Sequence, residues 1–126
     1  MKRIITMLTT AFLALSSLHA SQVEVGDVVT LKVVKVFDDH PPFNVAATKL
    51  EIFDIANDYL DHDKVDAFWD LVMEGLLLPI PKDTQARVIQ FSQTPENKQL
   101  CAQVSILNGS RKGSSVWTGA DSLIKD

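Results

Sequence analysis

Two histidines lie among carboxylates, and these are the first places in the sequence whose residue types suggest metal chemistry. His40 ends the stretch DDH, and His62 stands in the middle of the stretch DHD. Imidazole and carboxylate groups suit zinc or manganese, so the two stretches would make a metal site if the fold brought them together. Each stretch, however, falls at an expected end of a helix or strand, where acidic side chains cap amides and stay solvated. We therefore expect no metal ion and no other cofactor.

Cys101 is the single cysteine, and it is the other candidate for chemistry. It lies inside an expected strand, and the residues of that strand include no cation to lower the pKa of its thiol. The sequence has no Gly-x-Ser-x-Gly stretch, and no pair of carboxylates is marked as a buried acid–base pair. We therefore expect a protein that is not an enzyme.

A binding site is a better candidate than a catalytic one, and it falls in the stretch ILNGSRKGSSVW. Arg111 and Lys112 lie on an expected turn, a few residues before Trp117. A cation near an aromatic ring can hold a ligand that carries a carboxylate or a ring of its own. The alternative, which we favour, is that Trp117 belongs to the core of a small barrel and that the two cations are a solvated turn.

The N-terminus predicts export. Lys2 and Arg3 precede a short apolar stretch that ends in small residues, which is typical of a cleavable signal peptide over residues 1–20. No cysteine lies near the expected cleavage region, so we expect a periplasmic or secreted protein without a lipid anchor. No second apolar stretch is long enough to span a membrane.

The remaining chain, residues 21–126, has the length of a single domain. Without the two N-terminal cations, the formal net charge falls from −4 to −6. An acidic domain repels phosphate backbones, so nucleic acid is not an expected partner.

The order of expected elements predicts an α+β fold. A long first strand is expected from Val28 to Phe37, where β-branched residues are dense. A helical hairpin follows at about residues 46–75, with Asp63 as the expected cap of its second helix and Gly75 at the C-terminal end. Further strands are predicted at about residues 85–91, 100–106 and 114–117.

Side chains alternate in the strand at residues 100–106. Four of them are expected to face the core of the sheet: Leu100, Ala102, Val104 and Ile106. Cys101 then points to the opposite side. The hairpin carries an apolar stripe that also needs a surface to cover: Val65, Phe68, Trp69 and Val72. We therefore expect Cys101 beneath or beside the hairpin, reduced and inert, in a monomeric protein.

The C-terminal part resembles a known family over residues 82–124, which read KDTQARVIQF and, after a polar loop, CAQVSILNGSRKGSSVWTGADSLI. This stretch resembles bacterial SH3-like (Src-homology-3-like) domains. The positions that fit the family pattern are Thr84, Val88, Val104, Ile106, Gly109, Gly113, Trp117 and Leu123. The sequence departs from it at Asp83, where the family usually has Gly, and at Thr118, where it usually has Val. The resemblance implies a small SH3-like β-barrel with the helical hairpin inserted into it or packed on it.

Two classes of function remain open. The resemblance implies an exported SH3-like module that binds a peptide or a cell-wall fragment. The alternative is a small acidic periplasmic inhibitor or immunity-type protein, whose charge would complement a basic toxin or hydrolase. Binding of the first kind would depend little on salt, whereas the association rate of an acidic inhibitor would fall steeply as ionic strength rises.

Overall fold

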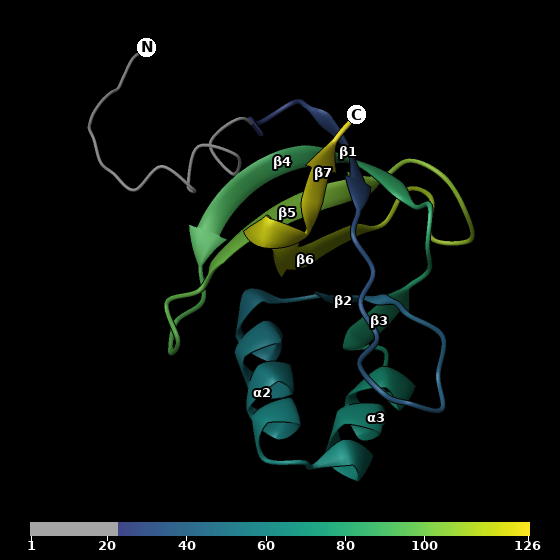
Figure 1. Cartoon of the computed structure of the whole chain (residues 1–126). Coiled ribbons are helices and arrows are strands. Elements are labelled where there is room, and N and C mark those ends of the chain that lie inside the picture. The colour runs from purple at the N-terminus through teal and green to yellow at the C-terminus, as the bar shows by residue number, and fades with distance from the viewer. Residues whose placement is uncertain (1–22) are drawn as a thin grey trace.

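The computed structural model describes residues 23–126, so the predicted signal peptide lies outside the described residues. Within this range, seven strands and two α-helices form a sheet with a helical hairpin against it (Figure 1). The elements are β1 (Val28–Leu31), β2 (Asn44–Ala47), α2 (Leu50–Asp61), α3 (Val65–Met73), β3 (Leu77–Ile80), β4 (Gln85–Gln93), β5 (Leu100–Ile106), β6 (Ser115–Gly119), the short 3-10 helix η1 (Ala120–Ser122) and β7 (Leu123–Lys125). Neither α-helix is long and apolar enough to cross a bilayer.

The strands form one antiparallel sheet in the order β3-β2-β6-β5-β4-β1-β7. β4 and β5 pair along their length apart from a bulge between Val88 and Gln90, and β4 curves strongly (Figure 1). The sheet does not close, and β3 and β7 are its edges. It nevertheless curls around one apolar cluster, because Leu78 of β3 and Leu123 of β7 pack in the same place. The predicted α+β class is confirmed.

This cluster, called the sheet core below, follows the two-residue period of the strands. Its members with less than 2% of their surface exposed are Val29, Leu31, Ala46, Ile80, Ala86, Ala102, Val104, Ile106 and Val116. Burying a valine, leucine or isoleucine side chain contributes about 1.5–3 kcal/mol to the free energy of unfolding. The expected facing of the strand at residues 100–106 is confirmed for three of its four residues. Leu100, at the start of β5, is 48% exposed.

A second cluster, called the hairpin core, fills the space between the two helices and the other face of the sheet. Its buried residues are Phe43, Ala47, Ile52, Phe53, Ala56, Phe68, Leu71, Leu77 and Cys101. Strands β2, β5 and β6 contribute to both clusters through alternate residues. In β5, for example, Cys101 faces the helices and Ala102 faces the sheet core. The predicted position of Cys101 beneath the hairpin is therefore confirmed.

The C-terminal end of α3 agrees with its prediction, whereas the N-terminal end does not. Gly75 adopts a left-handed conformation (φ 77°), and its N–H donates to the Val72 carbonyl oxygen at 3.0 Å, so the predicted C-terminal end is confirmed. The predicted cap at Asp63 is wrong, because Lys64 occupies the N-cap position and no side chain caps the helix. Asp63 itself has a positive φ of 56° and turns the chain between the helices. Aspartate tolerates this conformation better than most residues do.

β1 is shorter than predicted, since it ends at Leu31 rather than Phe37. Beyond Leu31, the pairing is reduced to one isolated bridge between Val34 and Phe43. The Lys32 carbonyl oxygen accepts a hydrogen bond from the Asn44 side chain at 2.8 Å instead of continuing a ladder. A run of β-branched residues favours a pleated surface, but it forms a strand only as far as neighbouring strands extend beside it.

The predicted start of the hairpin at residue 46 is also wrong. Ala46 and Ala47 belong to β2, which pairs with β3 on one side and with β6 on the other, and α2 begins at Leu50. β3 was not predicted, because it contains Pro79. Proline lacks the N–H that a ladder needs, but it is tolerated on an edge strand, and β3 is an edge of this sheet.

Candidate binding site

The predicted ligand-binding residues lie on the β5–β6 hairpin and on β6. Arg111 and Lys112 are exposed in the turn between the strands, whereas Trp117 is half-buried in the middle of β6. In the part of the chain that the structure describes, no cation–π contact joins the indole to either cation. Ligand binding by these three residues stays a prediction.

The preferred interpretation of Trp117 as a residue of the barrel core is wrong. Its indole packs against the hairpin core, and its neighbours Val116 and Thr118 are fully buried on the other side of β6. Thr118 is the position at which the SH3-like pattern usually has Val. Its hydroxyl donates to Oδ1 of Asn44 at 2.7 Å, so the presence of β2 beside β6 gives this buried threonine a partner.

The two histidines take part in local contacts at separate places. His40 lies 3.0 Å from Oδ1 of Asp39 through Nδ1, and its ring stacks on Trp69 with the ring centres 4.7 Å apart. His62 is at the end of α2, where its Nδ1 lies 2.9 Å from the Asp58 carbonyl oxygen. Among residues 23–126, no group of three or more His, Cys, Asp or Glu side chains is arranged to hold a metal ion.

Cys101 has the environment of an unreactive thiol. Its side chain is fully buried in the hairpin core. Burial raises the pKa of the Cys101 thiol to about 12, and the negative charges of Asp54 and Asp121 act in the same direction. The thiolate, which is the nucleophilic form, is therefore scarce at neutral pH.

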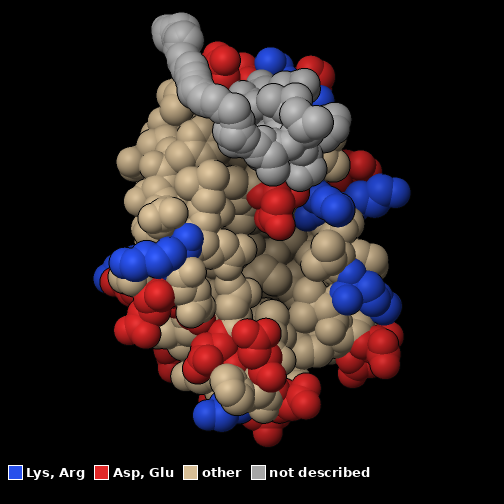
Figure 2. Space-filling model, turned by 60° about the vertical axis from the view of Figure 1, so that its left-hand side comes forward, with Lys and Arg blue, Asp and Glu red and all other residues tan. Residues whose placement is uncertain are grey.

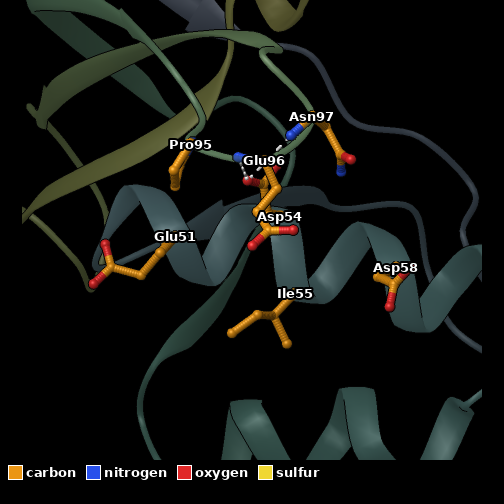
Figure 3. Close-up of a pocket in the computed structure, with 7 residues that line it drawn as sticks. All are labelled: Glu51, Asp54, Ile55, Asp58, Pro95, Glu96 and Asn97. Carbon is orange, nitrogen blue, oxygen red and sulfur yellow. Dashed lines mark hydrogen bonds between the residues drawn. The ribbon is translucent and has the colours of Figure 1, made fainter.

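A pocket of about 320 Å³ lies between α2 and the loop that joins β4 to β5 (Figure 3). The helix contributes three carboxylates and one apolar side chain, and the loop contributes Pro95–Asn97. The lining residues are Glu51, Asp54, Ile55, Asp58, Pro95, Glu96 and Asn97. Sequence reasoning did not find this pocket, because its two sides are about 40 residues apart along the chain.

Asp54 holds the two sides of the pocket together. It is 5% exposed, and its Oδ2 accepts hydrogen bonds from the backbone N–H groups of Glu96 at 2.8 Å and Asn97 at 3.4 Å (Figure 3). Burial raises the pKa of Asp54, but hydrogen bonding from Thr94, Glu96 and Asn97 outweighs it and holds the pKa below its usual range. A signal was present in the sequence, since Asp54 lies four residues after Leu50 and therefore falls on the apolar side of the predicted helix.

Charge is divided very unevenly between the two parts of the molecule. Residues 49–75, called the hairpin segment, contain eight carboxylates and two lysines, a formal net charge of −6. The rest of the described chain, called the β part, contains eight carboxylates and eight cations. Acidic side chains gather over the helical half of the face shown in Figure 2. The hairpin segment therefore accounts for the whole net charge of residues 23–126.

Comparison with known proteins finds no relative of this chain. No family model matches the chain, and no curated protein or solved structure is significantly similar to it. The arguments below therefore depend on the fold, the charges and the contacts described above.

Proposed function

We propose that this chain is an exported binding module in which strands β1 and β4–β7 form a small SH3-like barrel. Support comes from five strands that lie side by side, β7, β1, β4, β5 and β6, with η1 between β6 and β7. Gly109 and Gly113 have positive φ angles in the β5–β6 turn, in keeping with the two glycines of the SH3-like pattern. On this proposal, β2, the two helices and β3 are an insertion between β1 and β4.

The hairpin segment is the contact surface in this proposal, and the observation that carries it is the segregation of charge. A protein that needed acidity only for solubility would distribute it over its surface. Here, eight of the sixteen carboxylates lie in one segment of 27 residues that has only two cations. Such a surface attracts a cationic partner and raises the rate of encounter with it.

The chemistry of the partner follows from this charge. A peptide or protein rich in lysine and arginine complements the hairpin segment, whereas nucleic acid and other polyanions are repelled. Of the two ligands expected from the resemblance, a basic peptide fits this surface better than an anionic cell-wall fragment. The module binds without catalysis, which is in keeping with the buried and protonated Cys101 thiol.

The same observation favours a second candidate function, that of a small acidic inhibitor or immunity-type protein. This is the case in which the cationic partner is a toxin or a hydrolase, and the hairpin segment covers its basic active-site surface. The two candidates differ in the identity of the partner and in whether binding abolishes the activity of the partner.

The experiment is to capture partners from periplasmic extract on the immobilised protein, purify the partner, and measure its association rate from about 50 to about 500 mM salt. We expect a basic partner whose association rate falls at least tenfold over this range. A variant that neutralises three hairpin carboxylates should associate more slowly and depend less on salt: Asp58→Asn, Asp66→Asn and Asp70→Asn.

The matched control removes the same charge from the β part, through Glu24→Gln, Asp83→Asn and Asp121→Asn. This control variant should retain most of the association rate of the wild type and most of its salt dependence. Equal effects of the two variants, or a partner whose association is indifferent to salt, would contradict the assignment of the hairpin segment as the contact surface.

Export is tested separately by the intact mass of the protein recovered from the periplasm. We expect a mature chain produced by cleavage between about residues 16 and 21. A protein that retains Met1, or that is found only in the cytoplasm, would show that the export part of the proposal is wrong.

A further inference from the structure

One face of α3 exposes three apolar side chains in a row. Val65, Trp69 and Met73, called the apolar row, are four residues apart, so they lie along one side of the helix over about 12 Å. Val65 is 41% exposed and Met73 is 86% exposed, while Trp69 is half-buried. Single exposed apolar residues are common on protein surfaces, but three apolar residues aligned on one helix face are typical of an interaction surface.

An acidic row runs beside the apolar row. Asp66, Asp70 and Glu74 each follow one member of the apolar row in sequence, and all three are exposed. Successive residues are about 100° apart around a helix, so the two rows are neighbours along the same side of α3. The residues of α3 include no cation, and Lys64 immediately precedes them.

The indole in the centre of the apolar row is held in place. The His40 ring stacks on Trp69 at 4.7 Å between ring centres, and the ring centres of Phe37 and Phe68 each lie 5.4 Å from that of Trp69. A partner that contacts Trp69 therefore meets a side chain that is already ordered. Less conformational entropy is lost on binding than for a free surface tryptophan.

We propose that these two rows form the docking surface for a basic amphipathic helix of the partner, an inference that rests on the proposed function. The apolar face of such a helix covers Val65, Trp69 and Met73, and its lysine or arginine side chains pair with the acidic row. A second copy of this chain is disfavoured as the occupant, because it would bring the same acidic row against the first. An anionic membrane surface is disfavoured for the same reason.

The test uses a defined probe, a helical peptide of about 18 residues composed of leucine and lysine with all leucines on one face. A peptide of the same composition, with its leucines distributed around the helix, is the control. Binding is measured by NMR titration of the whole mature protein at about 150 mM salt. We expect the amphipathic peptide to bind at least tenfold more tightly and to shift the amide signals of α3.

Two matched pairs of variants locate the binding. The substitutions Val65→Ser and Met73→Ser should together weaken binding at least tenfold. The control pair Ile89→Ser and Ile124→Ser, at residues of β4 and β7 that are 40% and 50% exposed, should leave binding unchanged. Neutralising the acidic row (Asp66→Asn, Asp70→Asn, Glu74→Gln) should weaken binding more than neutralising three carboxylates of α2 (Glu51→Gln, Asp58→Asn, Asp61→Asn). Each set removes the same charge.

The outcomes separate this inference from the proposed function. Both peptides could bind with equal affinity, and both charge variants could weaken that binding equally. The hairpin segment as a whole then attracts the peptides, so the docking surface is wrong and the proposed function stands. If neither charge variant changes binding, both are overturned. Shifts confined to the β part would overturn the docking surface and favour the predicted site around Trp117.

Discussion

The β part and the hairpin segment of this molecule are built from different residues. The β part has balanced charge and an aliphatic core, against which Phe91 is the one described aromatic residue to pack. The hairpin segment has a net charge of −6, and the other seven described aromatic residues pack in or against its core. The eight carboxylates of the hairpin segment repel one another, and the aromatic core offsets that cost. On the proposed function, the sheet supplies the scaffold and the hairpin segment supplies the surface for a partner.

The two parts are nevertheless joined through shared backbone. Strands β2, β5 and β6 place one set of alternate residues in the sheet core and the other set in the hairpin core. A destabilising substitution in either core therefore also affects strands that form part of the other core. Substitutions in each core test how far the two parts are independent. They follow from the largest to the smallest expected loss of stability.

The largest effect is expected for Phe68→Ala in the centre of the hairpin core. Phe68 is fully buried, and its ring lies 5.3 Å from that of Phe37 and 6.4 Å from that of Phe43. Removing it should lower the free energy of unfolding by about 3–5 kcal/mol, as measured by urea denaturation. Ile89→Ala, at an exposed residue of β4, is the control and should cost much less. A loss below about 1 kcal/mol for Phe68→Ala would mean that the helices are not packed on the sheet.

Trp117→Ala should have the next largest effect. The indole is half-buried against the hairpin core, so its truncation should cost about 2–3 kcal/mol, below the range for a fully buried tryptophan. Trp117→Phe keeps part of the contact and should cost less. If Trp117 is instead a ligand-contacting residue, the thermal melt of Trp117→Ala should be unchanged and only binding should be lost.

A smaller effect is expected for Asp54, which ties α2 to the β4–β5 loop. Asp54→Ala removes the acceptor for the N–H groups of Glu96 and Asn97, and should cost about 1–2 kcal/mol. The exposed neighbour Asp58→Ala is the control, and it should cost less than about 0.5 kcal/mol. Equal losses for the two variants would show that the loop is not held through Asp54.

The lowered pKa of Asp54 also predicts how the stability of the protein depends on pH. The pKa of Asp54 is held below its usual value of 3.8, so its contribution is present above about pH 4 and is lost as the pH falls through the folded-state pKa. The wild type should therefore lose more stability between about pH 5 and about pH 3 than Asp54→Asn does, as measured by melting temperature. Parallel pH profiles would contradict this assignment.

Some features of the fold were visible in the sequence because they depend on local pattern. The two faces of β5 follow from strict alternation, and the end of α3 follows from a glycine at the required position. β2 and β3 were not visible, since Ala46 and Ala47 have no strand preference of their own and Pro79 argues against a strand. Pairing with β3 on one side, and on the other with β6 about 70 residues further along the chain, makes β2 a strand.

The candidate surfaces divide in the same way. The acidity of residues 49–75 can be counted in the sequence, and the spacing of Val65, Trp69 and Met73 can be read there too. The sequence alone assigned Trp69 and Val65 to a single apolar stripe with Phe68, because a nine-residue helix has too few turns to separate a buried face from an exposed one. The pocket beside Asp54 depends on a contact between distant segments, which no local pattern predicts.

The smallest change in stability is expected at Cys101, where the two parts of the molecule meet. Cys101→Ala leaves only a small cavity and should cost about 1 kcal/mol. The thiol is more informative as a probe, because burial raises its pKa to about 12 and it can react only when the hairpin lifts from the sheet. Local openings of this kind require less free energy than global unfolding.

We therefore expect thiol labelling of Cys101 to report a lower free energy than urea unfolding does, and Phe68→Ala to lower it further. The control is a cysteine in the sheet core, Val104→Cys in a Cys101→Ala background, which should be labelled only through global unfolding. If both cysteines report the same free energy, the sheet and the hairpin unfold together, because the strands they share couple the two cores. The hairpin segment would then be part of the scaffold rather than a separable surface carried by it.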